Sequence, residues 1–262
     1  MKIQNPIQAY TLFTNVLQFE RKIVGIKFLH TQEMFDQAKA TIRTGPINYC
    51  VMVQAAASHN IAYKIQGKTI ACPAGAWALG LIPSTTERNS GKLSFDCGLY
   101  GDMATAQSAQ NSIIHCNHEA YGVMVKPLEQ YFTDNEIPDV VLVIANPYTI
   151  MRIVQGYSYK KGIRDYRMGG NQGICSELTA APYIRNDLNI SLLCIGTRHA
   201  SHWHDDEMGA AFPFNLLEII TDGIISTLNA MENNQNKQKI QENLIKLDIT
   251  DIPIKFNYNY YR

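Results

Sequence analysis

Residues 139–155 read DVVLVIANPYTIMRIVQ, and this stretch decides the fold class. Residues 140–145 are all apolar and mostly branched, which is typical of a strand buried on both faces of a sheet. Asn146 and Pro147 then begin a helix that we expect to continue to about Gln155, because proline fits the first turn of a helix. A buried strand followed at once by a helix indicates an α/β protein.

The same alternation of short strands and amphipathic helices extends in both directions from this stretch. The expected strands are 23–29, 68–72, 121–128 and 190–195. The expected helices are 7–19, 33–42, 50–57, 174–184 and 215–231, with a loop and one helix in 83–111. We therefore expect an α/β fold, or an α+β fold with mixed strand pairing.

Three segments are expected along the chain. Residues 1–22 form an N-terminal helix, and 23–231 form a single globular domain of two related halves, about 23–111 and 121–231. Residues 232–262 form a polar C-terminal tail, expected as a solvated helix or a loose segment with an aromatic end.

The composition excludes several classes of protein. The 23 basic and 23 acidic side chains balance, so no overall positive field favours nucleic acid or anionic lipid. The apolar runs are far shorter than the roughly 18 residues of a membrane span. No apolar block follows Met1 and Lys2, so we expect no secretion signal and a cytoplasmic location. The 6 cysteines should then remain reduced.

Two distant segments share a pattern that pairs four of these cysteines. Each has a cysteine at the start of a helix, Ala-Ala at the fifth and sixth positions after it, and then a strand that ends in a second cysteine. The pairs are Cys50 with Cys72 and Cys175 with Cys194, separated by 22 and 19 residues. We infer two related halves, each strand-helix-Cys-helix-strand-Cys, packed about a pseudo-dyad.

Two halves that face each other would bring the four thiols to one cleft. A helix N-terminus favours the thiolate, so we expect a lowered pKa for Cys50 and Cys175. Soft thiolates select an iron–sulfur cluster or zinc, and small neighbouring residues leave room for a [4Fe–4S] cluster. Zinc is the less favoured metal, and buried thiols without metal are the alternative. Cys97 and Cys116 lie outside the pattern and are expected to be packing residues.

Several of these segments together resemble a known family. They are VGIKF at 24–28, Tyr49-Cys50, CPAG at 72–75, ALGL at 78–81, PDVV at 138–141, Cys175 and CIGTR at 194–198. Over about residues 23–217 the chain is similar to domain of unknown function 169, a cysteine-containing family of archaea and anaerobic bacteria. The resemblance implies a cysteine-rich, cofactor-bearing cytoplasmic protein with no established reaction.

A basic, glycine-rich loop at 160–173 leads into the helix of Cys175. Its candidate anion-binding groups are the backbone N–H groups of Gly169, Gly170 and Gly173 and the charges of Arg164 and Arg167. The loop lacks the Gly-Lys-Ser/Thr of a Walker motif and the dinucleotide fingerprint. A plain mobile loop is the alternative.

Residues 199–207, HASHWHDDE, hold three histidines and three carboxylates. Because they follow Cys194 closely, His202 and His204 are candidates for general acid/base groups or substrate contacts at the thiol cleft. A polar loop with solvated histidines is the alternative. His115 and His118 flank Cys116 and are expected to be structural or surface residues.

These observations lead to one main hypothesis and two alternatives. The main hypothesis is a cytoplasmic [4Fe–4S] protein with redox or Lewis-acid chemistry on a small anionic molecule, acting as an oxidoreductase or lyase. An electron donor protein is an expected partner, and a homo-oligomer is compatible with the sequence. The alternatives are a metal-free enzyme with Cys50 or Cys175 as nucleophile and a histidine base, and a non-catalytic carrier of a small molecule or metal.

Overall fold

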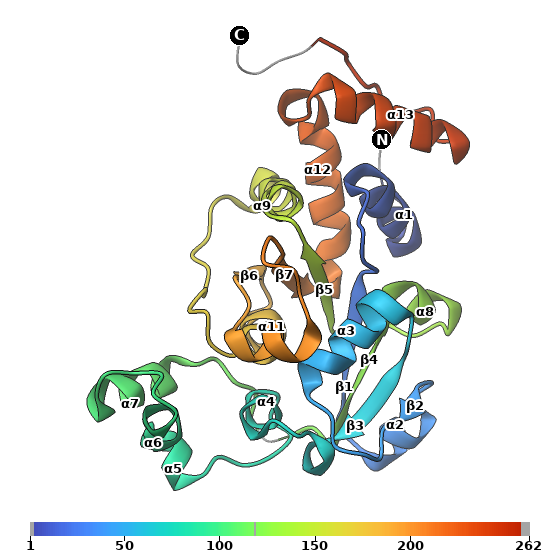
Figure 1. The fold of residues 1–262 in the computed structure, drawn as a ribbon. Coiled ribbons are helices and arrows are strands. Elements are labelled where there is room, and N and C mark those ends of the chain that lie inside the picture. Colours follow the sequence, from blue (N-terminus) through green and yellow to red (C-terminus); the bar gives the residue numbers. More distant parts are fainter. Residues whose placement is uncertain (1–2, 118, 258–262) are drawn as a thin grey trace.

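A computed structural model describes residues 3–117 and 119–257, in which one sheet lies between two layers of helices (Figure 1). Within this part of the chain the sheet has seven strands in the order β2-β3-β4-β1-β5-β7-β6. Neighbouring strands are antiparallel except β2 and β3, which are parallel. The predicted α/β class with mixed pairing is therefore confirmed.

The strands are β1 Val24–Leu29, β2 Thr41–Ile42, β3 Tyr63–Gln66, β4 Gly122–Pro127, β5 Val140–Ala145, β6 Asn189–Ser191 and β7 Met208–Pro213. The longer helices are α1 Pro6–Leu17, α3 Tyr49–His59, α7 Met103–Ser112, α9 Pro147–Lys161, α12 Leu217–Met231 and α13 Asn234–Lys246. The shorter α-helices are α2 Gln32–Gln37, α4 Pro73–Ala78, α5 Thr86–Asn89, α6 Lys92–Asp96, α8 Leu128–Thr133, α10 Ala181–Arg185 and α11 Ile195–Ser201. A π-helix, η2, covers Gly173–Ala180, and two 3-10 turns cover Gly67–Thr69 (η1) and Phe214–Leu216 (η3).

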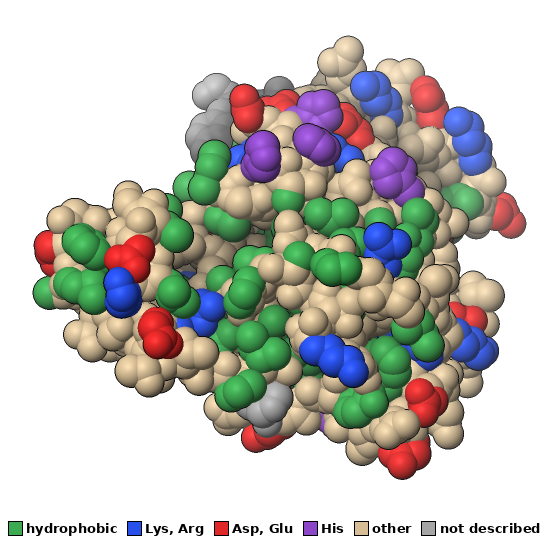
Figure 2. Space-filling model, turned by 60° about the horizontal axis from the view of Figure 1, so that its bottom comes forward, with side chains coloured by type: hydrophobic (Ala, Val, Ile, Leu, Met, Phe, Trp, Pro, Cys, Tyr) green, Lys and Arg blue, Asp and Glu red, His purple; other side chains and the backbone are tan. Residues whose placement is uncertain are grey.

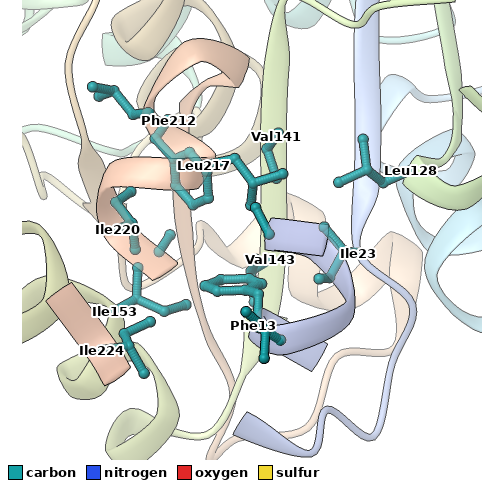
Figure 3. Close-up of a cluster of buried hydrophobic side chains, with 14 of the residues drawn as sticks. Phe13, Ile23, Leu128, Val141, Val143, Ile153, Phe212, Leu217, Ile220 and Ile224 are labelled. Carbon is teal, nitrogen blue, oxygen red and sulfur yellow. The ribbon is translucent and has the colours of Figure 1, made fainter. Parts of the chain in front are cut away.

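Strand β5 shows how alternate side chains build two separate cores. Val141 and Val143 point to one face of the sheet, where α1, α9 and α12 cover them. Figure 3 shows this core, in which Phe13 of α1 lies beside Val143 of β5, and Ile220 of α12 belongs to the same cluster. The N-terminal helix is therefore an integral part of this core.

The opposite face of the sheet carries the second core, and this core positions the cysteines. Leu142 of β5 and Ile26 of β1 pack there against α3 and the π-helix η2. Tyr49 at the start of α3 is buried, and its hydroxyl lies 3.1 Å from Oγ1 of Thr179 in η2. This contact joins the helices of Cys50 and Cys175.

Helices α9 and α12 cross at very close range, which holds the first core together. A Cβ atom at Gly223 would lie 1.9 Å from the backbone oxygen of Gly156, and one at Gly156 would lie 2.5 Å from Ile224. Any larger residue would separate the two helices. The sequence pattern predicted both helices, although it did not indicate this crossing.

The strand order has the same arrangement on each side of the central pair β1 and β5. β1 is followed outward by β4 and β3, and β5 is followed outward by β7 and β6, each step antiparallel. Within each series the chain visits the innermost strand first and then the outermost before it returns. This order agrees with two related halves, which remain a prediction.

Two predicted strands are wrong in position. Residues 68–72 form no strand: β3 ends at Gln66, and the chain turns at Gly67, where a Cβ would lie 2.4 Å from the backbone oxygen of Leu81. The strand predicted at 190–195 is shorter than expected: β6 ends at Ser191, because Leu193 has a positive φ of 65° that breaks the extended chain. The second cysteine of each pair therefore starts a helix and does not end a strand.

Other segments also differ from the expectation. The helix expected at 33–42 ends at Gln37, and Thr41–Ile42 pairs with β3 instead. The segment 83–111 contains α5, α6 and α7, which project from the body as a separate lobe (Figure 1). The polar segment after 232 forms helix α13, which buries Ile240 and Leu244. The aromatic residues Tyr258, Tyr260 and Tyr261 lie outside the described residues.

Candidate functional site

Four cysteines from distant parts of the chain line one cavity of about 610 Å³: Cys50, Cys72, Cys175 and Cys194. All four are free thiols and are partly buried. The cavity lies between the body and the α5–α7 lobe, which contributes Leu99 and Tyr100. Figure 2 shows the projecting lobe and the hollow beside it, with apolar side chains gathered along this face. The fold thus brings together the four residues that the sequence pattern had paired.

Each cysteine occupies the start of a helix. Cys50 is the second residue of α3, and Cys175 is the third residue of η2. Cys72 and Cys194 are the N-cap residues of α4 and α11, both with extended backbone. Helix α11 packs against α3, and α4 packs against η2, so the helix of each pair's second cysteine contacts the helix of the other pair's first cysteine.

Two glycines lie where the cysteine segments meet. A Cβ at Gly75 of α4 would lie 3.8 Å from Cβ and 3.9 Å from Sγ of Cys175, and 3.9 Å from Cβ of Cys72. A Cβ at Gly173 would lie 2.8 Å from the backbone N of Cys194. Gly173 thus allows Cys194 to approach the segment of Cys175, whereas Gly75 lies beside Cys72 and Cys175 at ordinary contact distance.

The expectation that the helix starts lower the cysteine pKa values is wrong. Burial raises the pKa of the Cys50 thiol, and it raises that of Cys175 well above the ordinary value. The neighbouring cysteines raise both further, because a second negative charge nearby disfavours ionisation. Desolvation thus outweighs the helix N-terminus in the metal-free protein.

Hydrogen-bonding groups surround two of the thiols. The hydroxyl groups of Ser201 and Thr197 in α11 lower the pKa of Cys50 and partly offset the effect of burial, and Ser201 Oγ has no hydrogen-bond partner among the described residues. The Cys175 thiol lies 3.7 Å from the backbone oxygen of Gln172, as a donor to that oxygen. Hydrogen bonds to sulfur are among the features that set the reduction potential of an iron–sulfur cluster.

The thiols differ in their fit to a single metal ion and to a cluster. Among residues 3–117 and 119–257, no group of three or more His, Cys, Asp or Glu side chains is arranged to hold one metal ion. Zinc requires all its sulfur ligands at about 2.3 Å from one point. A [4Fe–4S] cluster instead accepts each thiolate on a different iron, so its ligands can be spread around a cavity. Cysteine thiolates are the usual ligands of such clusters.

The lobe adds a fifth cysteine that sequence reasoning assigned to packing. Cys97 is exposed at the end of α6 and lines the same cavity. The Nδ2 group of Asn171 donates a 3.1 Å hydrogen bond to the Tyr100 hydroxyl, which ties the lobe to the glycine-rich loop. No regular pattern in 83–111 marks these contacts. Cys116 is buried in the second core, where burial raises its pKa to about 12.

The glycine-rich loop lines the cavity, but several of its polar groups already have partners within the protein. The N–H group of Gly169 donates a 2.5 Å hydrogen bond to the buried carboxylate of Glu177, and Gly170 also stabilises that carboxylate. The Arg164 side chain contacts Tyr157 and Asp187, away from the cavity. Glu177 thus occupies part of the site expected for an external anion.

Arg167 lies in a neighbouring cavity of about 400 Å³, which shares Tyr100, Gly169 and Asn171 with the cysteine cavity. Its backbone N–H group and carbonyl oxygen both bond the side chain of Asn189. The second cavity also contains Glu177. Gly173 does not line either cavity, and its lack of a side chain allows the backbone of Cys194 to lie close to it.

The structure does not bring His202 and His204 to the cysteines. Helix α11 carries the chain away from Cys194, and both histidines are exposed beyond its end. His204 lines a different hollow, near Glu207, and its backbone N–H group bonds the Glu207 carboxylate at 2.7 Å. No histidine of the described residues lines the cysteine cavity. His115 stacks on Trp77, and His118 lies outside the described residues.

No helix in residues 3–117 and 119–257 has the length and apolar character needed to cross a bilayer. Among curated proteins, the chain is similar to an uncharacterized protein of Methanocaldococcus jannaschii. The two are 28% identical over 212 residues, which cover 80% of this chain and 89% of that protein. No solved structure matches the chain.

The family comparison covers most of the chain. Residues 12–223 match the profile of domain of unknown function 169, described as "Uncharacterised ArCR". The matched region contains all seven strands described above and the four cysteines of the cavity. It also contains the segments on which the resemblance was based. The chain belongs to the domain of unknown function 169 family.

Proposed function

We propose that this protein binds a [4Fe–4S] cluster through Cys50, Cys72, Cys175 and Cys194. The observation that carries the proposal is the convergence of these four thiols, from segments up to 144 residues apart, on one cavity. Two pairs of segments supply them, and each cysteine lies at a helix start. A packing role would not require four small thiols to border the same open space.

The electrostatics of the cavity support a bound cation or metal core. Burial and the neighbouring cysteines raise the pKa values of the Cys50 and Cys175 thiols, which disfavours their ionisation as free thiols. Metal coordination deprotonates thiols outright, because the positive charge compensates both the desolvation and the mutual repulsion. The arrangement is therefore unfavourable for free thiolates and favourable for thiolates that share a metal core.

The volume of the cavity leaves space for a second molecule. The eight atoms of a four-iron core take on the order of 240 Å³ if each occupies about 30 Å³, the share of a water molecule in the liquid. The cavity measures about 610 Å³, so more than half of it remains. Pockets of this size commonly hold small organic ligands. Leu99, Tyr100 and Ile195 would contact such a ligand.

When bound, a cluster of this kind supplies one-electron transfer, or Lewis acidity at an iron with an open position. Four protein thiolates would occupy all four irons, which favours electron transfer. We therefore favour an oxidoreductase with a protein electron donor over a lyase, in the cytoplasm. The small anionic ligand expected from the sequence has less support, because no described residue that lines the cavity is charged. Arg167 in the second cavity would have to provide its charge.

Anaerobic purification of the full chain tests the proposal. We expect broad visible absorption, with about four irons and four acid-labile sulfides per chain. Cys50→Ala and Cys194→Ala should each lose most of the iron, whereas Cys116→Ala should keep it. Circular dichroism identifies variants that fail to fold, and serine variants replace any that do.

Three results would reject the four-ligand cluster. They are full iron in either alanine variant, a colourless protein with one zinc, and a colourless protein with one rapidly alkylated thiol. The last result would support the alternative cysteine enzyme, for which the described part of the cavity offers no histidine base. A colourless protein without a reactive thiol would leave a carrier function.

A further inference from the structure

Arg88 is a buried cation without an acidic partner. It belongs to α5, at the start of the lobe, and is only 7% exposed. Within residues 3–117 and 119–257, its guanidinium group forms no hydrogen bond or ion pair. The other buried arginine of this part of the chain, Arg152, pairs with Glu232 at 3.2 Å. Because a largely buried charge is costly, a negative charge nearby would stabilise Arg88.

The position of Arg88 points to the cysteine cavity as the source of that charge. Its guanidinium carbon lies 5.2 Å from the centre of the Trp77 ring. Trp77 belongs to α4, the helix that begins at Cys72 and packs against η2, which carries Cys175. Burial lowers the pKa of Arg88, and negative charges on Cys72 and Cys175 would raise it by a smaller amount. Arg88 is thus within electrostatic range of two of the four thiols.

We propose that Arg88 is the buried counter-charge of the cluster and raises its reduction potential. The inference rests on the proposed function, because four thiolates around a four-iron core carry net negative charge. Reduction adds one electron from the donor, with no bond formed or broken, and therefore increases that charge. A fixed positive charge nearby favours the reduced state over the oxidised one. Trp77 holds the guanidinium in place by stacking on it.

The test is a reductive titration of the anaerobically purified full chain with dithionite, monitored by electron paramagnetic resonance. In Arg88→Gln, the ratio of reduced to oxidised cluster at a fixed potential should fall about tenfold, which is 59 mV for a one-electron couple. Arg88→Lys keeps the charge and should stay within about twofold of the wild type. Lys92→Gln is the matched control, because it removes an exposed charge from α6 of the same lobe.

The outcomes separate this inference from the proposed function. Wild-type protein without iron rejects both. Wild-type protein with a cluster, combined with an unchanged potential in Arg88→Gln, rejects the inference alone. If Arg88→Gln fails to retain iron while Arg88→Lys retains it, the charge is required and the inference stands. If both variants lose iron, or if Lys92→Gln shifts the potential equally, Arg88 has no specific role as a counter-charge.

Discussion

Gly75 offers a direct test of whether a cluster lies between Cys72 and Cys175. A Cβ atom at this position would be 3.8–3.9 Å from both cysteines, which is ordinary van der Waals contact. Gly75→Ala should therefore fit without displacement. It lies inside helix α4, where alanine is favoured over glycine by up to about 1 kcal/mol. We expect a rise in Tm of about 2–4 °C and unchanged iron content.

Gly75→Leu should behave differently, because the leucine Cβ would already be in van der Waals contact with both cysteines. The remaining carbons must enter the cavity and occupy the space that the cluster requires. Overpacking of a filled site costs about 1–3 kcal/mol, which corresponds to about a 5- to 150-fold loss of cluster occupancy. The folded protein should survive, since the side chain can enter the open cavity when no cluster is bound.

The assay measures iron and acid-labile sulfide per chain after anaerobic purification, with circular dichroism and Tm as checks of folding. Gly101→Leu provides a control, since a Cβ at Gly101 meets no atom within 4 Å and the residue does not line the cavity. A Gly75→Leu protein with full iron would refute the reasoning. Any cluster would then lie elsewhere, and the closeness of Cys72 to Cys175 would have no role in binding it.

Three further predictions concern other parts of the fold. Gly223→Ala should destabilise the protein by about 3 kcal/mol in urea unfolding, because its Cβ would lie 1.9 Å from the Gly156 oxygen; an unchanged midpoint would contradict the close helix crossing. The hydrogen bond from Lys126 lowers the pKa of Asp134, so the wild type should lose stability as pH falls below about 4. In Lys126→Met, the urea unfolding midpoint should fall less as the pH is lowered. An equal fall in both proteins would exclude the Lys126–Asp134 pair as its cause. Thr197→Val should lower the reduction potential of a bound cluster, because it removes a hydroxyl group that lowers the pKa of Cys50. A dithionite titration in which the potential rose or stayed constant would contradict this prediction.

The sequence predicted the parts of the fold that follow from local periodicity. Residues 140–145 are apolar at every position, and they form the strand whose two faces support both cores. It did not predict β7, because MGAAFP at 208–213 is small and lacks β-branched residues. β7 is a strand because it pairs with β5 on one side and β6 on the other. Such pairing between distant segments cannot be predicted from the local sequence.

The candidate site could also be predicted from the sequence only in part. Spacing around Ala-Ala identified Cys50 and Cys175 as equivalent positions, and the structure places both near helix starts. The contribution of the lobe could not be predicted, because Cys97 and Tyr100 reach the cavity only through the packing of α5–α7 beside the body. The sign of the cysteine pKa shifts was also inaccessible, since it depends on how deeply the thiols are buried.

The position of each cysteine at a helix start bears on the proposal that the cavity holds a negatively charged core. The first backbone N–H groups of a helix have no partners within the helix and carry partial positive charge. Helices α3, η2, α4 and α11 all begin beside the cavity, each at or next to one of its cysteines. For the free thiols of Cys50 and Cys175 this effect is weaker than desolvation, which raises their pKa. If a metal core were bound, it would displace the thiol protons, and the same four helix ends and Arg88 would act on its residual negative charge. The arrangement thus favours a core that keeps a net negative charge, and a titration that found Arg88 and the helix ends without influence on the potential would contradict it.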